Sequence, residues 1–187
     1  MTVYSVPIPD VEGSAAGLAT FSPDLAGRAL PLVEHWTSRA RDGKVPLRAE
    51  IDPSAIVSLL PYVYVCERDA EGTLRYRLAG EHVQGIFGQS LRGRTLDDFV
   101  KDPQARVRTG RTFAAVLDRH CMAIGFGRVY RCVDRVIVGT RLVLPLRSGA
   151  GDPDTLIGVT VPQAERGLDD STPWAGDATR LYPLPFA

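Results

Sequence analysis

Residues 61–99 read PYVYVCERDAEGTLRYRLAGEHVQGIFGQSLRGRTLDDF, and this stretch decides the fold. Its first half predicts a β-hairpin, because residues 62–68 and 73–78 read as strands on either side of the short turn DAEG at 69–72. Glycine at the end of that turn can adopt the positive φ that a tight hairpin requires. We therefore expect two antiparallel neighbours here.

The second strand of this hairpin alternates apolar and charged residues. Leu74, Tyr76 and Leu78 are expected on one face, and Arg75 and Arg77 on the other. A period of two is typical of a strand whose sheet buries one face. The pattern therefore predicts a sheet with one apolar side.

Helical spacing replaces the strand period directly after Gly80. Val83, Ile86 and Phe87 have the i, i+3, i+4 spacing of a helix, and Gly88 suits its end. Thr95 begins a capping-box pattern that predicts one further helical turn carrying a phenylalanine.

Asp102-Pro103 predicts the start of the longest amphipathic helix, which we expect to extend to residue 121. Three strands are expected after it, at 122–132, 136–147 and 155–161.

A helix is also expected before the hairpin. Ser22-Pro23-Asp24 has the pattern of a helix start. Pro31 should bend or split this helix, and Gly43 should end it. Its apolar stripe includes Leu32, Val33 and Trp36, and we expect this stripe to pack on the sheet or on a second subunit.

The order of these elements predicts an α+β fold. Five antiparallel strands would carry short helices and one longer helix over one face, with an N-terminal helix in addition. The expected units are a flexible arm at 1–21, a helical segment at 22–43, the main domain at 44–163 and a proline-rich tail at 164–187.

The central stretch resembles a single-domain PAS-like family common in alphaproteobacteria, whose members carry a run of the form RLAG, FG and LxGR. The matching positions expected to be structural are Arg77, Leu78, Gly80, Gly88 and Gly93. Trp36, Asp52 and Pro53 match the region that precedes this run in the family. The resemblance extends over about residues 30–163 and implies the PAS fold and a sensory role. It also implies that Leu32, Val33 and Trp36 are candidates for a dimer interface.

A PAS plan leaves room for a cavity between the sheet and the long helix. The candidate lining residues are large apolar side chains on the short helices, the long helix and the strands. They are Tyr76, Phe87, Leu91, Phe99, Phe113, Val116, Leu117, Phe126, Tyr130, Leu142 and Leu144. A packed core would use the same residues, so the sequence leaves both interpretations open.

Composition excludes several classes of function. Lys and Arg number 22 and Asp and Glu also 22, so the chain lacks the basic excess of a nucleic-acid binder. Neither a secretory leader nor a run of about 18 apolar residues is visible, so we expect a cytoplasmic protein without membrane contact. Three widely spaced cysteines favour buried thiols over a disulfide frame or a zinc site.

Catalytic and cofactor motifs are missing from the sequence, so we do not expect an enzyme. His120 occupies the region where a haem-binding PAS domain can place its ligand, but a lone histidine near a helix end is more simply a cap, and no cofactor is expected. His35 and His82 are expected on exposed helix surfaces. Asp118 and His120 form the nearest acid–histidine pair, but residues two apart on a helix do not face each other.

The predicted function is therefore sensing or signal relay by a stand-alone PAS-like domain. It would bind a small, largely apolar ligand, a signalling protein, or both, and transmit the bound state through its N-terminal helix. A homodimer is the candidate assembly. One alternative is a protein-interaction module with a filled core. A small cone-shaped isomerase or hydrolase is the other, and it would need a carboxylate or histidine pointing into a cavity.

Overall fold

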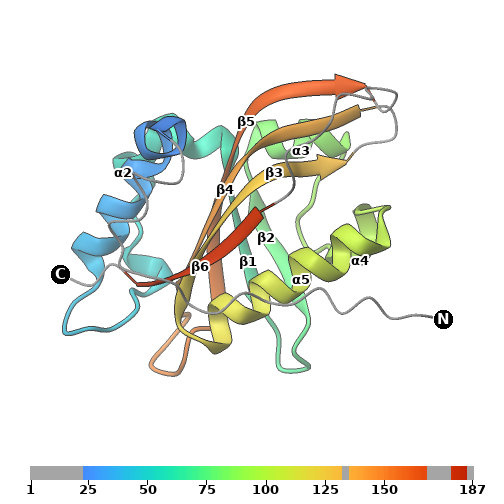
Figure 1. The fold of residues 1–187 in the computed structure, drawn as a ribbon. Coiled ribbons are helices and arrows are strands. Elements are labelled where there is room, and N and C mark those ends of the chain that lie inside the picture. Colours follow the sequence, from blue (N-terminus) through green and yellow to red (C-terminus); the bar gives the residue numbers. More distant parts are fainter. Residues whose placement is uncertain (1–22, 132–134, 168–177, 185–187) are drawn as a thin grey trace.

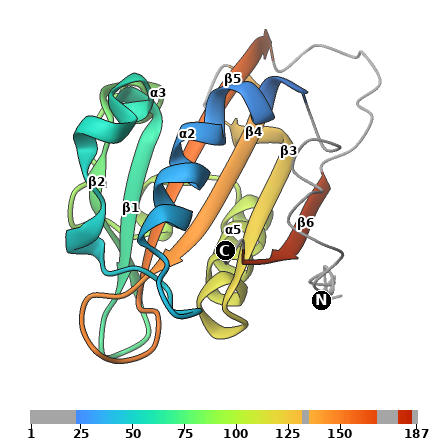
Figure 2. The same ribbon diagram turned by 90° about the vertical axis from the view of Figure 1, so that its left-hand side faces the viewer.

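The structure is a computed structural model that describes residues 23–131, 135–167 and 178–184. Within these residues six strands form one antiparallel sheet in the order β2-β1-β5-β4-β3-β6, and helices cover both of its faces (Figures 1 and 2). The α+β prediction is confirmed, with one strand more than expected. The expected arm at 1–21 lies outside the described residues.

The elements follow one another in the predicted order. The helices are α2 (Pro23–Arg39), the 3-10 helices η2 (Arg48–Glu50) and η3 (Pro53–Tyr62), α3 (Glu81–Phe87), α4 (Leu96–Phe99) and α5 (Pro103–Asp118). The strands are β1 (Val63–Arg68), β2 (Leu74–Ala79), β3 (Cys121–Arg131), β4 (Arg135–Leu146), β5 (Thr155–Gly167) and β6 (Ala178–Pro183).

Local hydrogen bonds explain why the predicted turns and helix starts form. In the β1–β2 turn, Gly72 has φ +83° and the carboxylate of Asp69 accepts a hydrogen bond from the Thr73 amide at 2.7 Å. Asp102 caps α5 by accepting from the Gln104 amide at 2.9 Å. The capping box of Thr95 with Asp98 is also present.

Leu78 does not share a face with Tyr76, so this part of the prediction was wrong. Leu78 pairs with Val65 and Tyr76 pairs with Cys66, which leaves Arg77 as an extra residue in β2. A bulge of this kind reverses the alternation of a strand beyond it. Tyr76 is consequently buried, whereas Leu78 is 51% exposed.

One hydrophobic core lies between α2 and η3 and one face of the sheet. Leu32, Val33 and Trp36 are buried in it, and the indole Nε1 of Trp36 donates to the carbonyl of Pro145 at 2.8 Å. The proposed dimer-interface role for these three residues is therefore wrong, because their side chains are covered by the chain's own sheet. α2 contributes its apolar stripe to the monomer core.

A second core lies on the other face of the sheet, beneath α3, α4 and α5. The buried residues of α5 are Phe113, Ala115, Val116 and Leu117, all in its C-terminal half. None of the helices within the described residues combines the length and apolar character needed to cross a membrane.

The C-terminal segment forms a sixth strand where we expected an extended tail. β6 pairs antiparallel with β3 from Cys121↔Pro183 to Phe126↔Ala178, and it buries Leu181 and Tyr182. Its strand character was hidden by the surrounding prolines, since proline is tolerated on an edge strand. Residues 168–177 and 185–187 of the expected tail lie outside the described residues.

His35 is buried, contrary to the prediction that it lies on an exposed helix surface. Its Nε2 accepts a hydrogen bond from the Asp52 amide at 2.9 Å, which ties α2 to the start of η3. Burial lowers the pKa of His35 below its usual 6.5, Arg39 lowers it further, and Asp52 partly opposes this shift. The folded protein thus favours the neutral imidazole, which is the form that can accept a hydrogen bond.

This contact predicts a loss of stability in mild acid. Because the pKa of His35 is lower in the folded than in the unfolded chain, its stabilising contribution is complete above about pH 6.5 and is lost as the pH falls through the folded pKa. Denaturant titrations between about pH 7.5 and 5 measure this slope. The control is His35→Gln, whose amide oxygen can accept the same hydrogen bond without titrating, and equal slopes in both proteins would contradict the assignment.

Candidate ligand-binding site

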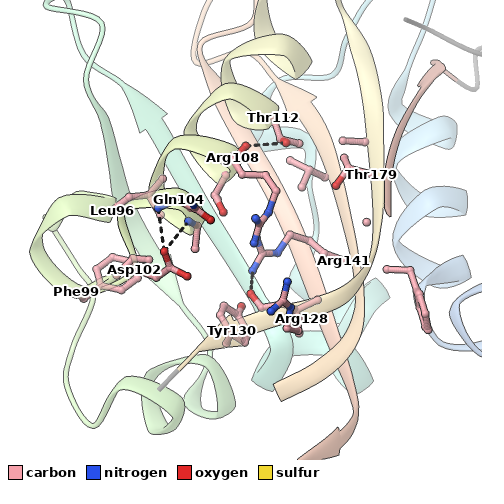
Figure 3. A pocket seen from close by; sticks show the side chains of 18 of the residues that line it. Leu96, Phe99, Asp102, Gln104, Arg108, Thr112, Arg128, Tyr130, Arg141 and Thr179 are labelled. Carbon is pink, nitrogen blue, oxygen red and sulfur yellow. Dashed lines mark hydrogen bonds between the residues drawn. The ribbon is translucent and has the colours of Figure 1, made fainter. Parts of the chain in front are cut away.

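A cavity of about 150 Å³ lies between α5 and the sheet (Figure 3). It is lined by residues 104–112 of α5, by α4 and the segment between α4 and α5, by one residue of α3, and by strands β2, β3, β4 and β6. Thr179 contributes from β6, so the unexpected sixth strand forms part of the wall. The cavity therefore joins residues from helices α3, α4 and α5 and from four strands.

Aromatic rings form a continuous side of this cavity. The ring of Tyr76 lies 5.2 Å from Phe99, Phe99 lies 4.7 Å from Phe87, and Phe87 lies 5.3 Å from Tyr130, all edge to face. Such edge-to-face pairs hold the rings in defined orientations. This side is a preformed apolar surface.

Arg141 of β4 provides the polar group at the end of this aromatic surface. Its guanidinium carbon lies 5.0 Å from the centre of the Tyr130 ring. Its Nη2 donates to the carbonyl of Val129 at 2.7 Å, and its Nε donates to Thr160 Oγ1 at 3.3 Å. The hydroxyl of Tyr130 donates to the same threonine oxygen at 3.0 Å. Neutral groups thus hold the guanidinium in place.

The opposite wall also carries polar side chains. Figure 3 shows Arg108 extending from α5 toward the space that Arg141 reaches from the sheet, with Arg128 nearby. Asp102 lines the cavity as well, but its Oδ1 accepts from the amides of Gln104 and Ala105 as the cap of α5. Arginine is therefore the predominant charged residue of the lining.

A comparison with protein families matches nearly the same residues as the resemblance seen in the sequence. A family model described as a PAS domain matches residues 27–161, which is most of the chain. The chain belongs to the PAS domain family. This confirms the resemblance on which the sequence interpretation relied.

Solved structures include a similar fold. The PAS domain of BvgS from Bordetella pertussis is 18% identical with a TM-score of 0.47, and the alignment covers 59% of this chain and 84% of that one. A search of the curated proteins finds no match. The PAS fold indicates a sensory or signal-relay role.

The structure brings only part of the predicted pocket set to the cavity of this PAS domain. The predicted residues that line it are Tyr76, Phe87, Phe99, Phe126 and Tyr130. Leu91, Phe113, Val116 and Leu117 are buried in the second core and are not part of the lining. They pack between the helices and the sheet in the second core.

Leu142 and Leu144 were assigned to the wrong face of β4. Both lie in the core under α2, and the cavity side of β4 is formed by Arg141 and Val143. Both faces of this strand are covered, so its apolar residues run continuously and no alternation marks the cavity side.

Sequence reasoning missed the arginines of this PAS domain. Arg141 sits in the run VIVGTRLVLPL, where a single charge interrupts a strand of buried residues. A charged residue in that position needs partners, and this was a usable signal. Arg108 and Arg128 carried no comparable signal, because exposed arginines are common on helices and strands.

Three glycines and an arginine of the family motif lie at turns, at helix ends and in a surface ion pair, whereas Leu78 is exposed. Gly88 ends α3 with φ +62°, and Gly93 has φ +78°. Arg77 pairs with Glu67 through Nε and Oε2 at 3.1 Å. Gly80 starts α3, and its amide donates to the Val63 carbonyl at 2.7 Å.

Cys66, Cys121 and His120 do not line the cavity. Burial raises the pKa of Cys66 strongly and that of Cys121 to about 11, so both stay protonated near neutral pH. His120, considered as a haem ligand, is exposed in the turn after α5 with φ +47° and does not line the cavity.

Proposed function

We propose that this PAS domain is a sensor that binds a small molecule in the cavity under α5 and relays the bound state to a protein partner. The cavity carries the proposal, because its aromatic side and fixed guanidinium form a preorganised site. No His, Cys or Ser is among the described residues that line it, and its one carboxylate, Asp102, caps a helix. This lining supports binding in preference to catalysis.

The two halves of α5 differ in a way that supports relay. All the buried residues of the helix lie in its C-terminal half, whereas the cavity-lining residues Ala105, Arg108, Thr109 and Thr112 come before them in the helix. The half with few buried apolar contacts is the one that can move at low cost. A ligand would shift α5 and α4 to the extent that it prefers one position over the other.

Blocking the cavity tests ligand binding. We expect Ala105→Phe to place a ring in the cavity and to reduce binding of the resident molecule at least tenfold. Because Ala105 is only partly buried on a helix, the fold should tolerate the change. Val107→Phe is the matched control, since Val107 is 49% exposed on the same helix and does not line the cavity.

Native mass spectrometry of protein purified from its own host measures the outcome. We expect a bound small molecule in the wild type and in Val107→Phe, and its loss in Ala105→Phe. The same spectra report the number of subunits. Equal occupancy in all three proteins, or no small molecule in any of them, would contradict a ligand role for the cavity.

Exposed apolar residues favour a second candidate, a protein-interaction module that needs no ligand. Leu78 is 51% exposed on the edge strand β2, and Val57 and Leu60 are 61% and 38% exposed on η3. Isolated exposed residues are ordinary, but β2 is a free edge among the described strands. Partner binding that is lost in Leu78→Lys but unchanged in Ala105→Phe would favour this candidate over the sensor.

A further inference from the structure

The balance of charge in the cavity points to the class of ligand. Three arginines line it, Arg108, Arg128 and Arg141, against the single carboxylate of Asp102. That carboxylate already accepts two backbone hydrogen bonds at the start of α5. The chain as a whole carries equal numbers of basic and acidic residues, so this excess of positive charge is local.

Arg141 is the group best placed to hold an anion. Its two hydrogen bonds go to neutral oxygens, of Thr160 and Val129, and none of the ion pairs within the described residues involves it. A guanidinium has more N–H donors than these two contacts use. A partly buried cation without a carboxylate partner is costly unless an anion completes its shell.

The position of Arg108 strengthens this assignment. It enters the same cavity from α5, so two positive charges converge from opposite walls (Figure 3). Like charges repel more strongly in a cavity than in water, and an anion between them is correspondingly favoured. Arg108 and Arg128 each take part in another interaction within the protein. Arg141 donates its hydrogen bonds to neutral oxygens, and we therefore assign the anion to Arg141.

The shape of the cavity restricts the rest of the ligand. A cavity of about 150 Å³ has the size that accommodates a benzene ring. The guanidinium of Arg141 lies over the ring of Tyr130, and the rings of Phe87 and Phe99 follow, with consecutive ring centres 5.3 and 4.7 Å apart. A flat apolar group would pack against them while an attached carboxylate reaches the guanidinium.

We propose that the cavity binds a small aromatic carboxylate, with its carboxylate on the guanidinium of Arg141 and its ring against Tyr130, Phe87 and Phe99. This inference rests on the proposed function, since it names the ligand class of the same cavity. It replaces the largely apolar ligand expected from the sequence. The arginine fork matches the two oxygens of a carboxylate.

Isothermal titration with three probes of similar size tests the charge preference. The probes are benzoate, benzyl alcohol and benzylamine, which are anionic, neutral and cationic at neutral pH. We expect benzoate to bind at least tenfold more tightly than benzyl alcohol, and benzylamine to bind more weakly still. Benzoate binding should weaken as salt concentration rises.

Two variants assign the effect to Arg141. We expect Arg141→Met, which keeps an unbranched apolar stem but removes the guanidinium, to weaken benzoate binding about ten- to a hundredfold and to leave benzyl alcohol almost unaffected. Arg92→Met is the matched control, because it removes one positive charge from an exposed loop position outside the cavity. Circular dichroism verifies that both variants are folded, and the probe series on the wild type stands if Arg141→Met does not fold.

The outcomes separate this inference from the proposed function. Benzyl alcohol or benzylamine binding as tightly as benzoate would overturn the inference, as would unchanged benzoate binding in a folded Arg141→Met. Failure of benzoate to bind at millimolar concentration would overturn it too. A neutral molecule recovered from the wild type but not from Ala105→Phe would still support the proposed sensor function.

Discussion

Trp36→Ala is expected to lower the free energy of unfolding by about 3–5 kcal/mol, the range for truncating a large buried aromatic side chain. Trp36 is fully buried between α2 and the sheet, and its indole N–H satisfies the carbonyl of Pro145 on β4. The substitution would leave a cavity and remove this bond. Equilibrium denaturation in urea, with two-state fits to circular dichroism, measures the change.

Two further variants define the origin of this loss. Trp36→Phe keeps an aromatic ring but not the hydrogen bond, and it should cost about 1–3 kcal/mol. Leu30→Ala on the same helix should change stability by about 0.5 kcal/mol or less, because Leu30 is 42% exposed. A small effect of Trp36→Ala would mean that α2 does not pack on the sheet, and that its apolar stripe remains available for a second subunit.

Gly80→Ala should destabilise the protein by about 3 kcal/mol, toward the upper end for overpacking of a buried site. The reason is close approach, since φ at Gly80 is −66° and suits any residue. A Cβ at this position would overlap the backbone carbonyls of Leu60 and Pro61 at the end of η3. The three nearest atoms all belong to the backbone, so no flexible side chain can move aside.

Gly85→Ala is the matched control within α3. A Cβ at Gly85 would meet nothing within 4 Å, and alanine favours a helix over glycine by about 1 kcal/mol. We therefore expect a slight gain in stability from the same chemical change five residues away. Thermal unfolding of both variants compares them directly, and similar losses in the two would refute the steric explanation for Gly80.

Much of the local structure could be predicted because its causes are short-range. The turn at Gly72 and the caps at Thr95 and Asp102 depend on a few neighbouring residues, so they could be predicted from the sequence. The bulge at Arg77 could not be predicted in this way. It depends on the register of β2 against β1, and that register reversed the face of Leu78.

The candidate site was only partly predictable. Tyr76, Phe99 and Tyr130 were placed in the pocket because the PAS plan puts those strands and helices around it. The arginines were missed, since apolar patterning does not distinguish a charged lining residue from an exposed one. The prediction that Leu142 lines the pocket was wrong, because the lining residues of β4 are its neighbours Arg141 and Val143. Both faces of β4 are covered, so its apolar pattern does not show which face lines the cavity.

By itself the sequence determined the order of helices and strands, their approximate ends and the family, because capping, turn geometry and motif spacing are properties of neighbouring residues. Tertiary structure alone decided that α2 covers the sheet opposite α5, that the tail adds β6, and that Arg108 and Arg141 approach one cavity. These features join residues far apart in the chain. Packing and strand register, which no local pattern encodes, bring them together.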